Sequence, residues 1–186
     1  MTQNFSENSR NNKKPSIINK TQFILGVIFL FVGSLEYFTS RPWETAYFLS
    51  KFSFLEKYFH KMPDIFGSFG GNAPELFHVL AFSLLTYSVI SQNRKNLIIV
   101  GIFWLTIDSL FEIGQEYSAF FHESFAEKFP DNFLITVLDN YFHNGSYDHF
   151  DLLATLFGSL MFVLLAAITS KPKIINPFPS KNSKLF

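Results

Sequence analysis

Four stretches of the sequence are each long and apolar enough to predict a helix that crosses a membrane. They are residues 21–38, 73–90, 97–114 and 150–169. A helix needs about 20 mostly apolar residues to cross about 30 Å of hydrocarbon, and each stretch comes close to that length. The first and last are apolar nearly all round, whereas the buried helices of a water-soluble bundle carry an amphipathic stripe. We therefore expect an all-α fold, an integral membrane four-helix bundle, within residues 21–170.

The Lys and Arg residues between these stretches predict which side of the membrane each segment faces. With the N-terminus inside, the cytoplasmic segments hold ten of them and the opposite segments five. This bias favours a multi-pass protein with both termini in the cytoplasm. Residues 1–20 are then a disordered basic tail and residues 171–186 a second cytoplasmic tail. In an alternative reading the first stretch is a cleaved signal peptide, because Val32, Gly33 and Ser34 make a passable cleavage site.

Composition and missing motifs exclude several classes of function. The formal net charge of zero argues against nucleic acid as a partner, since phosphate binding needs a basic excess. The chain has no cysteine, which removes disulfides and thiolate metal sites. It contains no P-loop, no HExxH zinc motif and no Gly-x-Ser-x-Gly nucleophile elbow. We accordingly predict no bound cofactor, and no metal site is assigned from local spacing.

The two long loops on the extracytoplasmic side mix aromatic and charged residues. This mixture is typical of helices that lie in the plane of the membrane interface, and partly buried helices that only cap the bundle are the alternative. The first loop carries Trp43, Ala46, Tyr47, Phe54 and Tyr58, and the second carries Phe133, Leu134, Val137, Leu138, Tyr141 and Phe142.

Polar and ionisable residues of the four stretches gather toward the extracytoplasmic side. In chain order they are Glu36, Glu75, His78, Asp108, Glu112, Gln115, Glu116, Asp148, His149 and Asp151. Asp108, Glu112 and Gln115 are spaced to share one face of the third helix. Asp148, Asp151 and Thr155 follow the start of the fourth helix in the same way. The cytoplasmic halves are almost purely apolar.

The cost of an embedded charge makes this face a candidate functional site. A carboxylate near the bilayer centre costs about 2.5 to 3.5 kcal/mol on insertion scales, so such residues should face the bundle interior or a wet cavity. Clustered carboxylates in a poorly solvated cleft do not all stay ionised, which is the condition for a general acid. The candidate catalytic residues are His78, Asp108, Glu112 and Asp151. Toward the headgroups an embedded charge costs less, and there the same pattern is also typical of a water-exposed rim. The residues for which we favour such a rim are Glu36, Glu75, Glu116, Asp148 and His149.

Three short motifs on these helices resemble those of the VanZ-like membrane proteins. His78 is followed by an aromatic residue, Glu112-Ile-Gly-Gln115 is similar to the Glu-x-x-Gln of the third helix, and Asp148-x-x-Asp151 opens the terminal signature. The matching residues are His78, Phe82, Glu112, Gln115, Asp148, Asp151 and Gly158. Two departures stand out: Thr155 occupies the position of the family Asn, and the segment between Gln115 and Asp148 is expanded.

The resemblance implies a small cell-envelope membrane protein from a family without a settled reaction, named for a protein associated with resistance to the glycopeptide teicoplanin. Our leading hypothesis is a polar extracytoplasmic cleft that binds or modulates an envelope lipid or a lipid-linked cell-wall precursor. Its ligand-binding residues would be His78, Glu112, Gln115, Asp148, Asp151 and Thr155.

Other functions remain open at this point. The first is an intramembrane metal-dependent hydrolase that uses His78, Glu112 and Asp151, and the second is a structural protein that binds another membrane protein. A proton- or ion-coupled transporter is disfavoured, because no embedded charge continues the path through the cytoplasmic half.

Overall fold

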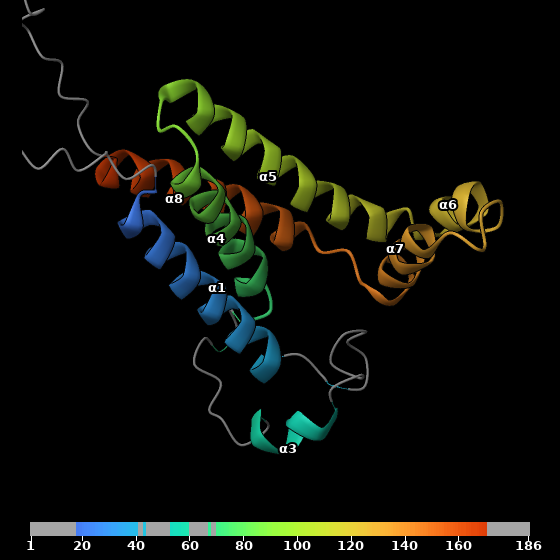
Figure 1. Ribbon diagram of the computed structural model, residues 1–186. Coiled ribbons are helices and arrows are strands. Elements are labelled where there is room, and N and C mark those ends of the chain that lie inside the picture. The colour runs from blue at the N-terminus through green and yellow to red at the C-terminus, as the bar shows by residue number, and fades with distance from the viewer. Residues whose placement is uncertain (1–17, 41–42, 44–52, 60–66, 68–69, 171–186) are drawn as a thin grey trace, which may run out of the picture.

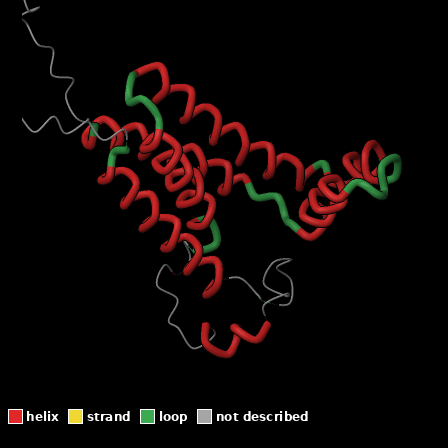
Figure 2. Tube along the Cα trace, in the orientation of Figure 1, coloured by secondary structure: helices red, strands yellow, loops and turns green. Residues whose placement is uncertain are grey.

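The computed structural model of the protein describes residues 18–40, 43, 53–59, 67 and 70–170. These residues form helices joined by turns, with no strand among them (Figure 2). Four long helices dominate, namely α1 (Lys20–Ser40), α4 (Ala73–Val89), α5 (Arg94–Glu116) and α8 (His149–Thr169). The shorter elements are η1 (Ser53–Leu55), α3 (Glu56–Phe59), α6 (Ser118–Phe121), the π-helix η3 (His122–Ala126) and α7 (Phe133–Asn144). The all-α prediction is confirmed for this part of the chain.

Three of the long helices, α1, α5 and α8, are long and apolar enough to cross a membrane. The second expected span forms α4, but α4 has only 17 residues. At 1.5 Å per residue it is about 26 Å long, less than the hydrocarbon thickness of about 30 Å. Length and composition thus support three of the four spans that the sequence predicted.

Helix α4 is nevertheless the centre of the molecule. It packs against α1, α5 and α8, and Val79, Leu80 and Leu84 on it are fully buried. The three surrounding helices instead expose large apolar side chains, among them Phe31, Ile102 and Leu160. Apolar residues on the outside are what a lipid solvent requires, whereas a protein of this size in water would bury them.

Close helix contacts in this bundle depend on small residues. A Cβ atom added to Gly158 of α8 would lie 2.5 Å from the backbone oxygen of Leu76 in α4. A Cβ on Gly33 of α1 would meet Phe77 at 2.7 Å. Small residues at helix interfaces let the two backbones approach, as is common in membrane bundles.

Amide side chains tie the helices together at the end of the bundle where α1 begins. Asn19, which is 6% exposed, donates from Nδ2 to Gln92 Oε1 and to the backbone oxygen of Thr169, each at 3.0 Å. Gln22 is fully buried and donates to Thr169 Oγ1 at 3.0 Å. Ordered structure therefore begins inside the segment 1–20 that the sequence assigned to a disordered tail. The rest of that tail, like residues 171–186, lies outside the described residues.

The second long loop folds into a compact unit made of α6, η3 and α7. Figure 1 shows this unit beyond the C-terminal end of α5, on the opposite end of that helix from its start at Arg94. Phe142 of α7 is buried and stands edge-on to Phe111 and Phe121. Its ring occupies the space that a side chain on Gly114 would need, which seats α7 directly on α5. Of the first loop, Trp43, Phe54 and Tyr58 are described, while Ala46 and Tyr47 lie outside the described residues.

Candidate functional site

Three carboxylates from three different helices meet at the end of the bundle away from the amide side chains. Glu75 lies in the first turn of α4, Glu112 near the end of α5 and Asp151 in the first turn of α8. One oxygen from each lies within 4.8 Å of the others. Glu112 and Asp151 are each only 5% exposed. We refer to these three residues as the carboxylate cluster.

Neighbouring amides hold two members of the cluster in position. Asn72, directly before α4, donates from Nδ2 to one oxygen of Asp151 and to Asp148 Oδ2, the latter at 3.4 Å. Asp148 also caps α8, because its Oδ1 accepts from the backbone N–H of Phe150 at 2.9 Å. Gln115 donates from Nε2 to Glu112 Oε1 at 3.1 Å. The starts of α4 and α8 are therefore fastened to each other beside the cluster.

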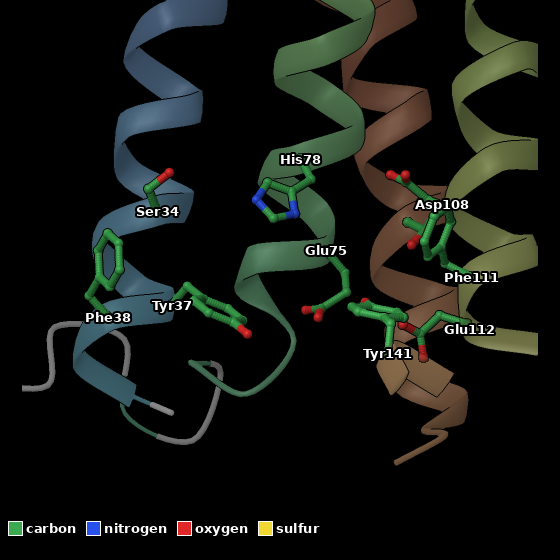
Figure 3. Close-up of a pocket in the computed structure, with 10 residues that line it drawn as sticks. Ser34, Tyr37, Phe38, Glu75, His78, Asp108, Phe111, Glu112 and Tyr141 are labelled. Atoms are coloured by element: carbon green, nitrogen blue, oxygen red, sulfur yellow. The ribbon is translucent and has the colours of Figure 1, made fainter. Parts of the chain in front are cut away.

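A pocket of about 290 Å³ opens beside the carboxylate cluster, between α1, α4, α5 and α7. It is lined by Ser34, Tyr37, Phe38, Glu75, His78, Asp108, Phe111, Glu112, Tyr141 and Thr155. In Figure 3 the side chains from α1 form one wall, those from α5 face them, and Glu75 and His78 of α4 lie between. Thr155 adds a buried hydroxyl, which donates to the backbone oxygen of Asp151 at 2.9 Å.

His78 and Asp108 lie at one end of this pocket, where His78 contacts aromatic side chains. The His78 ring contacts Phe82, with ring centroids 6.0 Å apart, and Phe82 stacks on Trp104 at 4.9 Å. Trp104 is fixed in turn by the hydrogen bond that its Nε1 donates to Thr86 Oγ1 at 3.0 Å. Asp108 Oδ2 is buried and has no hydrogen-bond partner among the described residues.

A further charged contact lies outside the membrane-spanning helices, in the α6–η3–α7 unit. His122 Nδ1 lies 2.9 Å from Asp139 Oδ2 and joins the π-helix to α7. The hydrogen bond to Asp139, together with the charge of that carboxylate, raises the pKa of the exposed His122 above its usual value of 6.5. Below pH 6.5 His122 is therefore protonated, and its contact with Asp139 is an ion pair.

The structure brings most of the sequence-predicted site residues together. His78, Asp108, Glu112 and Thr155 line the pocket, and Asp151 joins the carboxylate cluster. Gln115 and Asp148 contact the residues beside the pocket: Gln115 donates a hydrogen bond to Glu112, and Asp148 accepts one from Asn72. Glu116 and His149 are exposed, as the water-exposed rim reading expected, whereas Glu36 is 1% exposed.

Sequence reasoning gave too little weight to Glu75 and did not predict the aromatic wall of the pocket, which consists of Tyr37, Phe38, Phe111 and Tyr141. Glu75 was placed with the headgroup-facing residues, yet it completes the cluster. Its position one turn before His78 was the available signal. Tyr141 comes from the loop, and nothing in its local sequence indicates that α7 would bring it back to the pocket.

Comparison with protein-family models, with curated proteins and with solved structures finds no match for this chain, and the resemblance to the VanZ-like family therefore stays a prediction.

The residues at the site define what it can hold. Among the described residues, the lining contributes three carboxyl groups, Glu75, Asp108 and Glu112, and none of the ten lining residues is Lys or Arg. Aromatic rings, which attract cations to their faces, make up four more positions: Tyr37, Phe38, Phe111 and Tyr141. Such a pocket suits a ligand that brings positive charge and disfavours a bare anion. The all-oxygen cluster would also suit a hard cation such as Mg²⁺ or Ca²⁺ better than zinc.

Proposed function

We propose that this is a VanZ-like envelope membrane protein, with both termini in the cytoplasm, whose extracytoplasmic pocket binds the headgroup of an envelope lipid. The observation that carries the proposal is the pocket itself. It joins an acidic cluster to a wall of aromatic side chains at one end of the bundle. Ligand sites are typically concave and largely apolar, with a few converging polar groups, and this pocket has that composition.

The charge of the pocket narrows the class of lipid. Carboxylates at Glu75 and Glu112 would repel the phosphates of a lipid-linked cell-wall precursor unless a cation lay between them. A headgroup with a protonated amine meets the carboxylates directly and places its ammonium group against the rings of Tyr37 and Phe111. We therefore expect an amine-bearing lipid as the preferred ligand, and a phosphate-rich precursor only together with a divalent cation.

A matched pair of lipids tests this proposal. Phosphatidylethanolamine and its N-acetylated form have the same chains and phosphate, but only the first has a positive amine. Native mass spectrometry of the purified protein should show binding of the first lipid at least about tenfold tighter, a difference of about 1.4 kcal/mol. Glu112→Gln should remove most of that preference, whereas Glu116→Gln, at an exposed position of the same helix, should keep it.

Two results would contradict lipid-headgroup binding. Equal affinity for the two lipids would show that the carboxylates do not read the amine. If Glu112→Gln lowers the melting temperature and leaves the lipid preference intact, the polar face serves the architecture of the bundle and the search turns to a protein partner.

The carboxylate cluster supports a second candidate, an intramembrane metal-dependent hydrolase. A divalent cation held by Glu75, Glu112 and Asp151 would activate a water molecule, and His78 would be left as the neighbouring acid or base. The donor set thus differs from the His78, Glu112 and Asp151 combination that the sequence suggested. Elemental analysis decides the matter: stoichiometric metal that is lost in Asp151→Asn supports the hydrolase, and metal-free protein removes it.

A further inference from the structure

The apolar surface of α5 does not stop where that helix ends. Leu110 and Ile113 are 58% and 42% exposed, and Tyr117 and Phe120 continue the same face at 61% and 65%. The intervals of three, four and three residues are those of one helix face, although Tyr117, with φ −103° and ψ 29°, marks the turn where α5 ends and α6 begins. The backbone follows, because Tyr117 N–H donates to Ile113 O at 3.1 Å and Phe121 N–H to Tyr117 O at 3.0 Å.

The length of α5 places the end of this face at the membrane surface. Its 23 residues extend about 35 Å, which already exceeds the hydrocarbon thickness of about 30 Å. With Arg94 at one edge of the hydrocarbon, Tyr117 and Phe120 would lie at headgroup level on the other side, where aromatic side chains are enriched. The α6–η3–α7 unit begins at this depth.

Helix α7 has more apolar surface than the bundle covers. Its apolar arc includes Phe133, Leu134, Leu138 and Phe142, but only Phe142 is buried. Phe133 and Leu134, in the first turn of α7, are 77% and 69% exposed. Polar residues such as His143 occupy the opposite side. His143 lies nine positions after Leu134, which corresponds to two and a half helical turns.

We propose that the α6–η3–α7 unit is seated in the headgroup–acyl boundary of the leaflet at the site end of the bundle, with Phe133 and Leu134 inserted into lipid. The occupant of this surface is the bilayer that α5 would cross, because the exposed apolar residues of α5 are followed directly along the chain by the exposed Tyr117 and Phe120. An amphipathic helix buries its apolar face about 5 to 10 Å into that boundary. The same helix contributes Tyr141 to the lining of the pocket, and Phe142 seats it on α5 at Gly114. The inference rests on the membrane-spanning helices and does not depend on which ligand the pocket takes.

Single-cysteine labelling tests this seating, because the natural chain has no cysteine. Leu134→Cys and the matched His143→Cys, both at exposed positions of α7, are labelled with an environment-sensitive fluorophore and reconstituted into liposomes. Lipids with a spin label on the acyl chain should quench the label at 134 several-fold more than the label at 143. Iodide, supplied on both sides of the membrane, should show the reverse order.

Two outcomes overturn the proposal. Equal quenching of both labels by iodide would place Leu134 in water. A label at 134 that is shielded from both quenchers would show that protein, for example a second copy of this chain, covers the surface instead. Circular dichroism of the labelled proteins checks that each is folded, and a third label at Phe120→Cys repeats the measurement if the first variant is not.

Discussion

Gln92 donates a hydrogen bond from Nε2 to Gln22 Oε1 at 2.7 Å and so joins the turn between α4 and α5 to the first turns of α1. Gln22 passes the connection on to α8, because its own Nε2 reaches Thr169 Oγ1 at 3.0 Å. The α4–α5 turn, α1 and α8 are thus connected at one end of the bundle by two side-chain amides.

Replacing Gln22 with Leu should destabilise the protein without changing the pocket. Interhelical hydrogen bonds in membranes contribute about 0.6 kcal/mol each on average, so the loss of the contacts made by Gln22 should cost about 1 to 2 kcal/mol. Thermal unfolding in detergent measures the change, with Thr21→Ala at an exposed neighbouring position as the control. Unchanged melting in Gln22→Leu would show that the amides add nothing to stability.

Gly158→Ala should be more damaging than Gly101→Ala, although both glycines are helical and face another helix. The new Cβ at 158 would lie 2.5 Å from the backbone oxygen of Leu76, and a backbone atom cannot move aside. Overpacking of this kind typically costs about 1 to 3 kcal/mol. At 101 the nearest atom is Phe162 Cε1 at 3.4 Å, which is ordinary contact. Removing a helical glycine also favours the helix by up to about 1 kcal/mol.

Thermal melting of the two glycine variants provides the measurement. We expect a lower melting temperature for Gly158→Ala and an equal or higher one for Gly101→Ala. If the two variants melt alike, α8 can shift away from α4 and the close approach is not required.

Asn72→Asp should destabilise the protein more than Asn72→Ala. Alanine only removes the two hydrogen bonds that the amide donates to Asp148 and Asp151. Aspartate adds a negative charge next to the same carboxylates, and like charges at contact distance in a poorly solvated site repel strongly. Melting curves at neutral and acidic pH test this. The gap between the variants should narrow in acid as the carboxylates take up protons, and a pH-independent gap would contradict the electrostatic account.

The contact between His122 and Asp139 should make the α6–η3–α7 unit more stable in mild acid. The hydrogen bond to Asp139 raises the pKa of His122 in the folded protein, so the contact contributes fully below 6.5 and is lost as pH rises through the raised value. Histidine NMR should record a pKa above 6.5 for His122, and Asp139→Asn should bring that pKa down. A titration of His122 that ignores this substitution would disprove the pairing.

Sequence reasoning located the helices well because membrane burial leaves a strong signal. The fourth stretch was placed at 150–169 and forms α8 (His149–Thr169), a difference of one residue. The third was placed at 97–114, whereas α5 spans Arg94–Glu116, because the side chain of Asn93 caps the helix by accepting from the backbone N–H of Asn96. The polar residues at the two ends of α5 were assigned to the neighbouring loops, although a membrane-spanning helix can extend past the hydrocarbon on both sides.

The site was predictable only where periodicity along one helix could be used. The i, i+4 spacing put Asp108 and Glu112 on one face of α5, and both line the pocket. Neither the pairing of Asn72 with Asp151 nor the return of Tyr141 has such a signal, because each depends on how separate helices pack. Asn19 and Gln22 were overlooked for the same reason. A polar residue next to a basic tail is ordinarily expected to be exposed to solvent, whereas both side chains are buried.

The shortness of α4 affects how the bundle is built at the site end. Because α1, α5 and α8 surround it, α4 does not have to match a bilayer by itself, and its length of about 26 Å is about 4 Å less than a hydrocarbon layer of about 30 Å. Its first turn carries Glu75 into the pocket, which side chains of the longer α1 and α5 line as well. The number of residues in this one sheltered helix therefore sets where Glu75 lies along the bundle, next to Glu112 and Asp151.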